Sequence, residues 1–560
     1  MVFSRSDWVA LTAIGLLALA ACGGSERFPL REPMRRDDDE RPFSPAPEEY
    51  VSPFVWDGAD QLLFRPIAWF FAVDPAGRAV NVNAFDEVPD SSWFTNRVGV
   101  APMSLEEIAQ GSCGEQVLSV DAEPGSWIID QGKPNGANPG FRVNIPGLGK
   151  FLLKADPEGE PERATGATAI ASRIYHAIGY FAPCDSVVHF DPKLLRLKPG
   201  LVATDNSGIP RPFDQRALEK LLARASHRDG LVRMGASRWL PGMPIGPYRY
   251  EGTRDDDPND VIDHEDRREL RGGRLLAAWL NHFDTREQNT MDVFMADPQR
   301  EGYGYIRHYI LDLGDCFGSV WDEDEISRRL GHAYYLDVPY VLEDFVTFGL
   351  IERPWERARR DGGIFNYFSA RDFDPELWRG GYPNPAFTRM TEADGAWMAR
   401  IIARFSDEDI AAAVSVGKYD VASSRYLTQA LIARRDRVLR RYFAKLSPLA
   451  DLEVRGDALC GVDLGVMRHI VSERDEARVL TAGIRNGDTL EPIDPRHVQL
   501  GERGAFCVDL ASARVEELDR STDPSYLVVE LNGGSEVPLR AHLYDLGRAT
   551  ALRLVGIERE

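Results

Sequence analysis

The chain lacks an excess of basic residues and is poor in histidine and cysteine. Its 66 Lys and Arg face 88 Asp and Glu, which gives a formal net charge of -22. A nucleic-acid partner needs a basic face for the phosphate backbone, so we expect none here. The ten histidines are scattered and no Cys-x-x-Cys pair occurs, which leaves a zinc site with little support.

Hydrophobic runs long enough to cross a membrane are also missing. The apolar run over residues 8–21 is too short to span a bilayer as a mature helix, and no later stretch is long enough. This run ends in Leu19-Ala20-Ala21-Cys22-Gly23. That ending resembles the lipobox of bacterial lipoproteins, in which the cysteine thiol receives a lipid. We therefore expect a signal peptide over residues 1–22, a lipid anchor on Cys22 that holds the chain to a membrane, and a place in the cell envelope, at the outer membrane or facing the periplasm.

The segment before the apolar run leaves an alternative open. Asp7 offsets the positive charge of Arg5, so an ordinary secretory signal would also explain this N-terminus. Export in either form permits disulfides among the other five cysteines, and Cys460 and Cys507 lie in strand-like segments that could pair. Residues 23–50 are polar and rich in Arg, Asp, Glu and Pro, which predicts a flexible tether.

A chain of 560 residues is longer than a single hydrophobic core usually accommodates, which predicts several domains. Aromatic and β-branched patches between residues 53 and 111 predict strands, and the following Met-Ser-Leu-Glu-Glu-Ile-Ala-Gln, residues 103–110, predicts a short helix. Next come three antiparallel strands and a helix, expected over residues 126–130, 141–145, 150–154 and 165–178. Helical patterns dominate from about residue 325 to 446, and short strands follow. The expected domains are residues 51–240, residues 241–448, and a β-rich domain over residues 449–560.

One short loop gathers polar side chains that are able to bind protons or metals. The apolar stretch that ends at Leu280 is followed by Asn281-His282-Phe283-Asp284-Thr285-Arg286-Glu287-Gln288-Asn289. His282, Asp284 and Asn289 fit the spacing H-x-D-x-x-x-x-N of a protein-kinase catalytic loop. The pattern alone is only suggestive, because a chain of this length contains it by chance a few per cent of the time, roughly.

Further groups of the same kind occur in the order that a kinase requires. After an apolar strand, Asp312-Leu313-Gly314 resembles the magnesium-binding D-F-G. Upstream, Lys154 ends the third expected strand, where kinases keep the lysine that holds phosphates. Glu162, between that strand and the next helix, is positioned to pair with Lys154.

The chemistry of phosphoryl transfer asks for these residue types. The protein must neutralise phosphate charge and orient a nucleophile, since little covalent work is required of it. Lys154 would supply a positive charge at the phosphates, and Asn289 and Asp312 would be oxygen ligands of magnesium. Asp284 would accept the proton of the nucleophile, with Arg286 near the transferred phosphate.

These motifs together resemble the protein-kinase-like superfamily, and its divergent branches more than ordinary Ser/Thr kinases. Those branches include the phosphatidylinositol kinases, the HipA-type toxin kinases, and the secretory-pathway and spore-coat kinases. The resemblance covers roughly residues 126 to 318, with the helical part to about residue 447 compatible as a C-terminal lobe. It implies an α+β, bilobal protein-kinase-like fold with a β-rich N-lobe, a helical C-lobe and an added small C-terminal β domain. It also implies ATP and Mg as ligands and transfer of a phosphoryl or nucleotidyl group to an acceptor.

The chain departs from the kinase pattern in several places. Gly132, Gly136 and Gly140 do not form G-x-G-x-x-G, although Gly136 is the glycine expected to cover the phosphates. Phe283 replaces the arginine that pairs with an activation-loop phosphate, and no A-P-E follows Gly314. Two alternatives therefore stay open. One is an inactive pseudokinase, and the other is a structural envelope lipoprotein whose C-terminal β domain docks an envelope protein.

Overall fold

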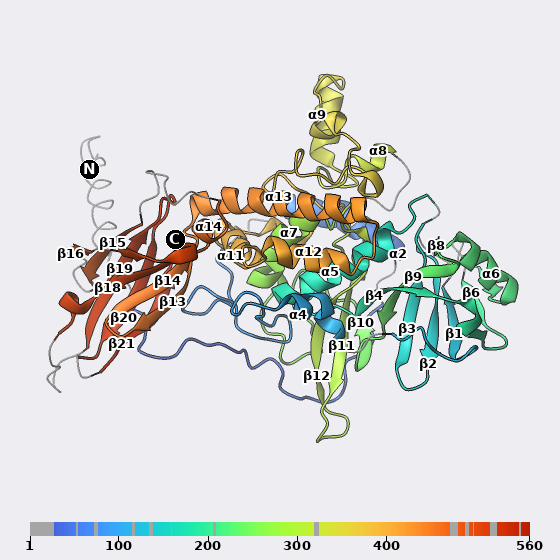
Figure 1. Ribbon diagram of the computed structural model, residues 1–560, viewed down its shortest axis with the longest axis horizontal. Coiled ribbons are helices and arrows are strands. Elements are labelled where there is room, and N and C mark those ends of the chain that lie inside the picture. The colour runs from blue at the N-terminus through green and yellow to red at the C-terminus, as the bar shows by residue number, and fades with distance from the viewer. Residues whose placement is uncertain are drawn as a thin grey trace, which may run out of the picture.

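The computed structural model describes most of the chain, with several gaps. The described residues are 27–51, 54–71, 77–114, 118–133, 138–157, 159–204, 209–318, 324–470, 480–487, 492–496, 498–515, 524–547 and 550–559. The fold is mixed α+β, with several separate sheets. Figure 1 shows two strand-rich ends joined by a helical middle, from which helix α9 (Val338–Thr347) stands out. No helix of the described residues is long and apolar enough to cross a membrane.

The first sheet contains the three strands that the sequence predicts as consecutive. Its strands lie in the order β4-β9-β3-β2-β1-β5, and β8 pairs with β9. Their bounds are β1 Trp127–Lys133, β2 Gly140–Ile145, β3 Gly149–Lys154, β4 Asp185–Phe190, β5 Leu195–Leu197, β8 His227–Arg228 and β9 Leu231–Arg238. Alternate side chains of β1, β2 and β3 are buried, as strands with one covered face require.

Helix α5 (Arg163–Ile178) connects β3 to β4 and packs beside the sheet. Its Thr165 lies against Gly235 of β9, where a β-carbon would be 3.5 Å from the threonine methyl group. The helix ends at Gly179, whose φ of 146° is open only to glycine at low cost. The strand-helix-strand order therefore places the end of β3 close to the start of α5. On the outer side of the sheet, β6 (Val202–Thr204), β7 (Pro210–Pro212) and α6 (Gln215–Arg224) form a small addition.

The chain leaves the first sheet at Arg238 and enters a second, three-stranded sheet at Met243. This sheet has the order β10-β11-β12, with β10 Met243–Gly246, β11 Thr290–Ala296 and β12 Gly304–Ile310. The helices that follow or interrupt it are α7 Arg268–Leu280, α8 Asp324–Ser327, α10 Pro385–Thr388, α11 Glu392–Ile402, α12 Asp407–Ser415 and α13 Val421–Lys445.

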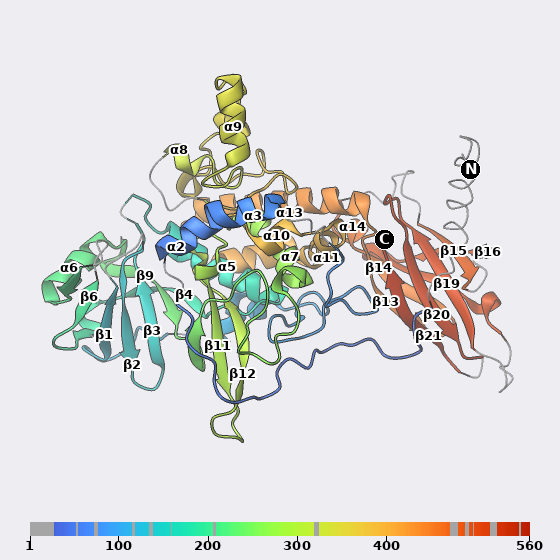
Figure 2. The same ribbon diagram turned by 180° about the vertical axis from the view of Figure 1, so that it is seen from behind.

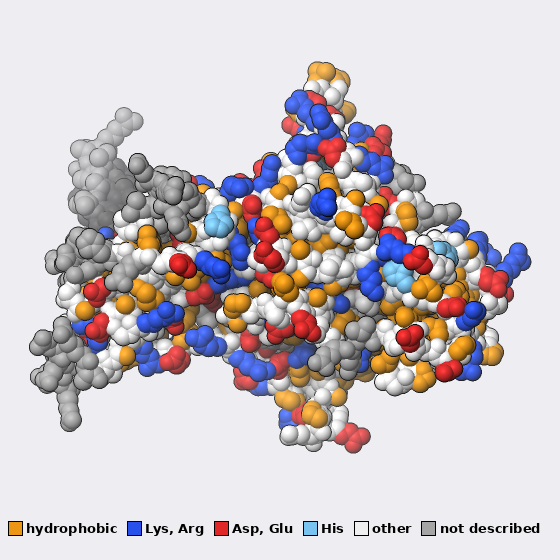
Figure 3. Space-filling model, in the orientation of Figure 1, with side chains coloured by type: hydrophobic (Ala, Val, Ile, Leu, Met, Phe, Trp, Pro, Cys, Tyr) orange, Lys and Arg blue, Asp and Glu red, His pale blue; other side chains and the backbone are white. Residues whose placement is uncertain are grey.

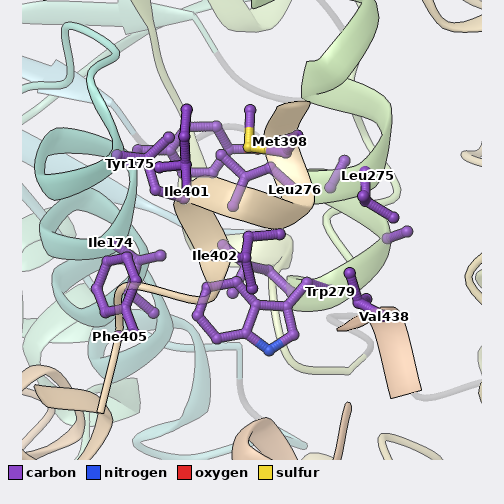
Figure 4. Close-up of a cluster of buried hydrophobic side chains, with 14 of the residues drawn as sticks. Ile174, Tyr175, Leu275, Leu276, Trp279, Met398, Ile401, Ile402, Phe405 and Val438 are labelled. Atoms are coloured by element: carbon purple, nitrogen blue, oxygen red, sulfur yellow. The ribbon is translucent and has the colours of Figure 1, made fainter. Parts of the chain in front are cut away.

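The main hydrophobic core lies among α5, α7, α11 and α13. Figure 4 shows Trp279 of α7 beside Ile402 of α11, with Val438 of α13 nearby. The Trp279 indole N–H donates to the carbonyl of Leu431, 2.9 Å away, so its polar edge is satisfied inside the core. Because α5 belongs to this core and also packs beside the first sheet, it ties the sheet to the helices.

The C-terminal region is β-rich and has its own core. Two sheets, in the orders β13-β14-β18-β17 and β16-β15-β19-β20-β21, enclose a cluster of leucines, valines and isoleucines. The strands are β13 Leu449–Arg455, β14 Ala458–Asp463, β15 Thr481–Asn486, β16 Pro492–Arg496, β17 Val498–Leu500, β18 Ala505–Asp509, β19 Ser525–Asn532, β20 Leu539–Asp545 and β21 Leu552–Glu558, with a short helix α14 Leu464–Met467. Cys460 and Cys507 face each other across β14 and β18 and form the predicted disulfide.

A second disulfide joins Cys113 to Cys184, and Cys316 is a buried free thiol. Cys113 follows the short helix α4 (Leu105–Gln110), and Cys184 directly precedes β4. The bond therefore fastens the segment before the first sheet to that sheet.

The prediction of strands between residues 53 and 111 is wrong. Within the described part of this segment the chain forms α2 (Phe54–Ala59), a π-helical turn (Asp60–Phe64) and α3 (Arg65–Phe71). The short helix predicted over residues 103–110 is confirmed as α4. Aromatic and β-branched residues favour strands on composition, but Leu63, Ile67 and Phe71 recur every four residues, which is the helical spacing.

The flexible tether expected over residues 23–50 is not what the described part of it forms. Phe28 is held by both of its backbone polar groups, to the hydroxyls of Tyr526 and Tyr544 in the C-terminal sheet. Phe43 pairs through its backbone with Gly304 of β12. Figure 2 shows this segment running along the molecule between those two places. A few well-spaced anchor residues hold it, and such anchors leave no periodic signal in the sequence.

Candidate functional site

The hairpin of β11 and β12 brings two of the predicted motifs together. Thr290 at the start of β11 pairs with Ile310 at the end of β12. Residues just before β11 and just after β12 must therefore be neighbours, and the Leu311 N–H donates to the Asn289 carbonyl at 2.8 Å. The polar loop (residues 281–289) and the segment that begins at Asp312 thus meet at one end of the hairpin.

The polar loop begins where α7 is forced to stop. Asn281 adopts a left-handed conformation, with φ 51° and ψ 43°, which closes the helix as a C-cap. His282 and Phe283 then turn inward, and the His282 Nδ1 lies 2.9 Å from the hydroxyl of Tyr175 on α5. Burial lowers the pKa of His282 to about 4, so the ring is neutral at pH 7. His282 therefore anchors the loop to α5.

Asp284 is oriented by its own loop. The Asn289 side-chain amide donates to the Asp284 carbonyl at 2.7 Å and to its carboxylate at 2.9 Å. The Arg286 guanidinium lies 3.4 Å from the same carboxylate and stacks over the ring of Tyr382. Two of the predicted site residues, Asn289 and Arg286, thus hold the third, Asp284, in place.

Asp312 and Lys154 are in direct contact, although 158 positions separate them in the sequence. The ammonium of Lys154, at the end of β3, donates to the Asp312 carboxylate at 2.7 Å. Asp312 has a left-handed backbone, φ 53° and ψ 50°, and half of its side chain is exposed. The attraction of Lys154 lowers the pKa of Asp312. Burial disfavours the charged lysine, but the ion pair prevails and raises the pKa of Lys154.

Gly314, two residues after Asp312, lies too close to α5 for a side chain to fit without displacing its neighbours. A β-carbon at Gly314 would lie 3.0 Å from the hydroxyl of Thr168 and 3.6 Å from the carbonyl of Ala164, both on α5. The segment therefore passes so close to α5 that any side chain would press on the helix. Further along, the carbonyl of Cys316 accepts from the buried Arg163 at 3.2 Å, which fastens the segment to the start of α5.

A second aspartate, Asp315, joins the site and was missed from the sequence. Desolvation, and then the nearby charges of Asp284 and Asp312, raise its pKa well above the ordinary value. Asp284 and Asp315 lie close enough to influence each other's pKa, and desolvation raises the pKa of Asp284 as well. Two carboxylates that share a buried site resist being charged together, which raises the pKa of at least one of them. The available signal was the second acid in Asp312-Leu313-Gly314-Asp315, three residues after the first.

Two more ionisable groups near Lys154 were also missed. Asp185, at the start of β4, is desolvated, which raises its pKa to about 7, and its carboxylate accepts from Ser237. Lys133, at the end of β1, has its pKa lowered by burial and then by the charge of Lys154. Neither belongs to a motif, and only the order of strands in the sheet places them beside Lys154.

The predicted pairing of Glu162 with Lys154 is wrong. Glu162 binds Arg228 through both carboxylate oxygens, at 2.9 and 2.8 Å. Its backbone is left-handed, with φ 66°, and it turns the chain into α5. Its neighbour Glu160 pairs instead with the buried Arg163. The acidic residues of the loop before α5 therefore bind arginines that fix the start of α5, and Lys154 pairs with Asp312 instead.

Two predicted residues lie outside the described part of the chain. Gly136, expected to cover phosphates, falls within residues 134–137, and Cys22, expected to carry the lipid, falls within residues 1–26. The remaining predicted residues other than Glu162 gather around the end of the hairpin. These are Lys154, Asp284, Arg286, Asn289 and Asp312.

The oxygen donors at this site suit magnesium, although they do not form a closed cage. Among the described residues, no group of three or more His, Cys, Asp or Glu side chains is arranged to hold a metal ion. Magnesium keeps several water molecules and is commonly bound by one or two carboxylates together with substrate phosphates. Asp312, half exposed, and the amide oxygen of Asn289 fit such an open site better than a dedicated metal cage.

A separate cavity of about 560 Å³ is lined by Arg274, Trp378, Arg434 and their neighbours. Of the polar loop it touches only Asn281, so the predicted residues lie outside it.

Comparison of the chain with protein-family models, with curated proteins and with solved structures gives no match.

Proposed function

We propose that this chain binds a magnesium nucleotide at the end of the β11–β12 hairpin and transfers a phosphoryl or nucleotidyl group to an acceptor. The observation that carries the proposal is the 2.7 Å contact between Lys154 and Asp312. The ammonium of Lys154 would leave Asp312 and bind phosphate oxygens of the nucleotide. Asp312 with Asn289 would then hold the metal. The metal, when bound, would neutralise phosphate charge.

Asp284 has the features of the general base in this proposal. Its raised pKa makes it a better proton acceptor than an ordinary aspartate, and Asn289 and Arg286 hold its carboxylate. Arg286 also lies close enough to stabilise negative charge that develops on a transferred group. Proton acceptance and charge stabilisation would thus come from one loop.

The fold supports a protein-kinase-like arrangement as part of the same proposal. The lysine lies on the third strand of an antiparallel sheet, and a helix follows that strand. Both features are expected of a kinase N-lobe. The helices α7, α11 and α13 would then form the second lobe, with the polar loop between them and the sheet.

Nucleotide binding is tested by thermal unfolding of the full chain with magnesium and ATP. A ligand at roughly a hundred times its Kd stabilises the folded state by about 3 kcal/mol, which is visible as a rise in Tm. We expect this rise in the wild type and in Glu301→Ala, a control at the far end of the same hairpin. Asp312→Ala should lose it. The absence of any nucleotide-dependent rise in the wild type would refute the proposal.

A binding module without turnover is the second candidate, and one observation favours it. Helix α5 carries no acidic side chain, and Glu162 is held by Arg228, so Lys154 lacks a carboxylate partner from that helix. A transfer assay separates the candidates. An enzyme should lose transfer in Asp284→Asn while keeping the nucleotide-dependent rise in Tm, whereas a binding module shows the rise and no transfer in either protein.

A further inference from the structure

The α9 projection (residues 338–351) exposes a set of large apolar side chains. The exposed fractions of Phe345, Phe348 and Leu350 are 81%, 89% and 85%. With a surface of about 200 Å² for an aromatic side chain, the two phenylalanines alone expose roughly 300 Å². A contiguous apolar patch larger than a few hundred Å² marks an interaction site in a protein that is otherwise well packed.

The apolar side chains of α9 form one stripe that faces solvent. They occupy positions i, i+3, i+4, i+7 and i+8 of the helix. Those positions are Val338, Val341, Leu342, Phe345 and Val346, and all five are exposed. In a surface helix this stripe normally faces the protein core. Here the other side faces the protein, where Tyr340 meets Trp355 edge to face and the Arg353 guanidinium lies over the Tyr340 ring. The orientation is therefore inverted.

The charged side chains beside this stripe are paired with the residues that directly follow the projection, and those residues pair with one another. Both acidic residues of α9, Glu343 and Asp344, bind Arg353, and Glu352 binds Arg357. Figure 3 shows a hydrophobic end on the projection, with charges of both signs collected beneath it. An element that enters a low-dielectric phase must neutralise its charges, because the desolvation of an unpaired charge is costly.

We propose that the α9 projection inserts its apolar stripe and tip into a lipid bilayer. Its shape favours a lipid surface over a second copy of the chain. The projection stands clear of the rest of the molecule in both views, so its tip can enter the acyl region while the body remains outside. Two convex tips that meet about a two-fold axis would cover only one side of each. Lipid chains would surround the tip on all sides, as they do for other interfacial helices.

The charge pattern favours a neutral lipid surface as well. The whole chain carries a formal charge of -22, which opposes attraction to anionic headgroups, and the ion pairs of the projection leave apolar burial as the driving force. Binding to phosphatidylcholine vesicles should therefore change less than about twofold between low and high salt, since the interaction has little charge to screen.

The test uses residues 23–560, so that neither the apolar run of residues 8–21 nor a lipid on Cys22 contributes. Sedimentation with phosphatidylcholine vesicles is compared for this protein, for Phe345→Ser/Phe348→Ser, and for Trp56→Ser/Phe71→Ser. The last is the matched control, because Trp56 and Phe71 are exposed aromatic residues of α2 and α3. We expect the first pair to lower the partition coefficient at least tenfold, roughly, and the control pair to leave it unchanged. Equal Tm values should show that all three proteins are folded.

Three results would overturn the proposal. These are no vesicle binding by the parent protein, equal loss in both double variants, and a steep fall of binding with salt. If the Phe345/Phe348 variant does not fold, insertion is read from Phe348→Trp. Its emission should shift to the blue and be quenched by brominated lipid, and an unshifted, unquenched signal would contradict insertion.

Discussion

A buried carboxylate of the C-terminal β domain is surrounded by hydrogen-bond donors, whereas two carboxylates of the polar-loop site face each other. Asp545 is fully buried between the sheets, where its oxygens accept from Arg514 and from the backbone N–H groups of Val515 and Gly547. Asp284 and Asp315, by contrast, face each other, and desolvation raises the pKa of both. The first arrangement satisfies a charge, and the second leaves charges in conflict.

This difference separates stability from function. A buried carboxylate with several donors stabilises the fold, and its loss leaves partners unsatisfied. Carboxylates that repel one another destabilise the fold, and such groups are commonly found where a ligand or a reaction needs them. Mutations in the C-terminal domain should therefore change stability alone, while mutations at the site should change ligand binding with little loss of stability.

The largest expected effect is the loss of the Cys460–Cys507 disulfide. The bond closes a loop with a sequence separation of 47, so removing it by Cys460→Ser/Cys507→Ser should lower the free energy of unfolding by about 4 kcal/mol. Denaturant unfolding measures this loss. The Tm rise with magnesium and ATP should persist, because the domain has a separate core; its disappearance in folded protein would break the comparison.

The anchor of the polar loop should respond to acid. The pKa of His282 is about 4 in the folded protein and about 6.5 when unfolded, so the unfolded state binds more protons between these values. The contribution of His282 to stability is therefore complete above pH 6.5 and is lost as the pH falls to 4, by about 3 kcal/mol in total. Other histidines titrate in the same window, so His282→Gln is the reference. Unfolding curves of equal pH slope for the two proteins would contradict the role of this residue.

Asp545→Asn should destabilise the C-terminal domain by about 2 kcal/mol, because the buried Arg514 loses one of its two charged partners and keeps only Asp457. Chemical denaturation at pH 7 gives the value. A neutral result would mean that the satisfied carboxylate does not stabilise the fold, and the proposed difference between the regions would fail.

Asp315→Asn is the matched change at the site, with the opposite sign. It removes repulsion from Asp284 and Asp312, so we expect a gain of about 1 kcal/mol at pH 8, reduced by the partial exposure of the Asp315 side chain. The gain should shrink at acid pH, where Asp315 of the wild type is protonated. Denaturant unfolding at both pH values measures it. A loss of stability at pH 8 would show that Asp315 is a structural carboxylate like Asp545.

Local periodicity was enough for the elements around the site. The three predicted strands, the last of which ends at Lys154, and the predicted helix that ends at Ile178 are confirmed. Their apolar residues alternate or recur at helical spacing, and such patterns depend only on residues close together in the sequence. The same reasoning failed for α2 and α3. There, exposed aromatic residues such as Trp56 and Phe71 imitate the composition of a strand.

The site itself was only partly accessible to sequence reasoning. Asp284 and Asn289 could be related by spacing, since both belong to one loop. The contact of Lys154 with Asp312 depends on how the first sheet packs beside the hairpin, and the capture of Glu162 by Arg228 depends on the β8–β9 turn. Asp185 and Lys133 enter through the strand order of the sheet, which no local pattern contains.

The sequence by itself determined the mixed α+β character, the strands and helices with strong periodicity, the acidic charge and the residue types available for chemistry. These properties depend on each residue and its near neighbours in the chain. Only the tertiary structure decided which of the charged groups meet, which of them lose solvent, and that the stripe of α9 faces outward. Each of those outcomes depends on distances between segments far apart in the chain, and such distances are set when the sheets and helices pack together.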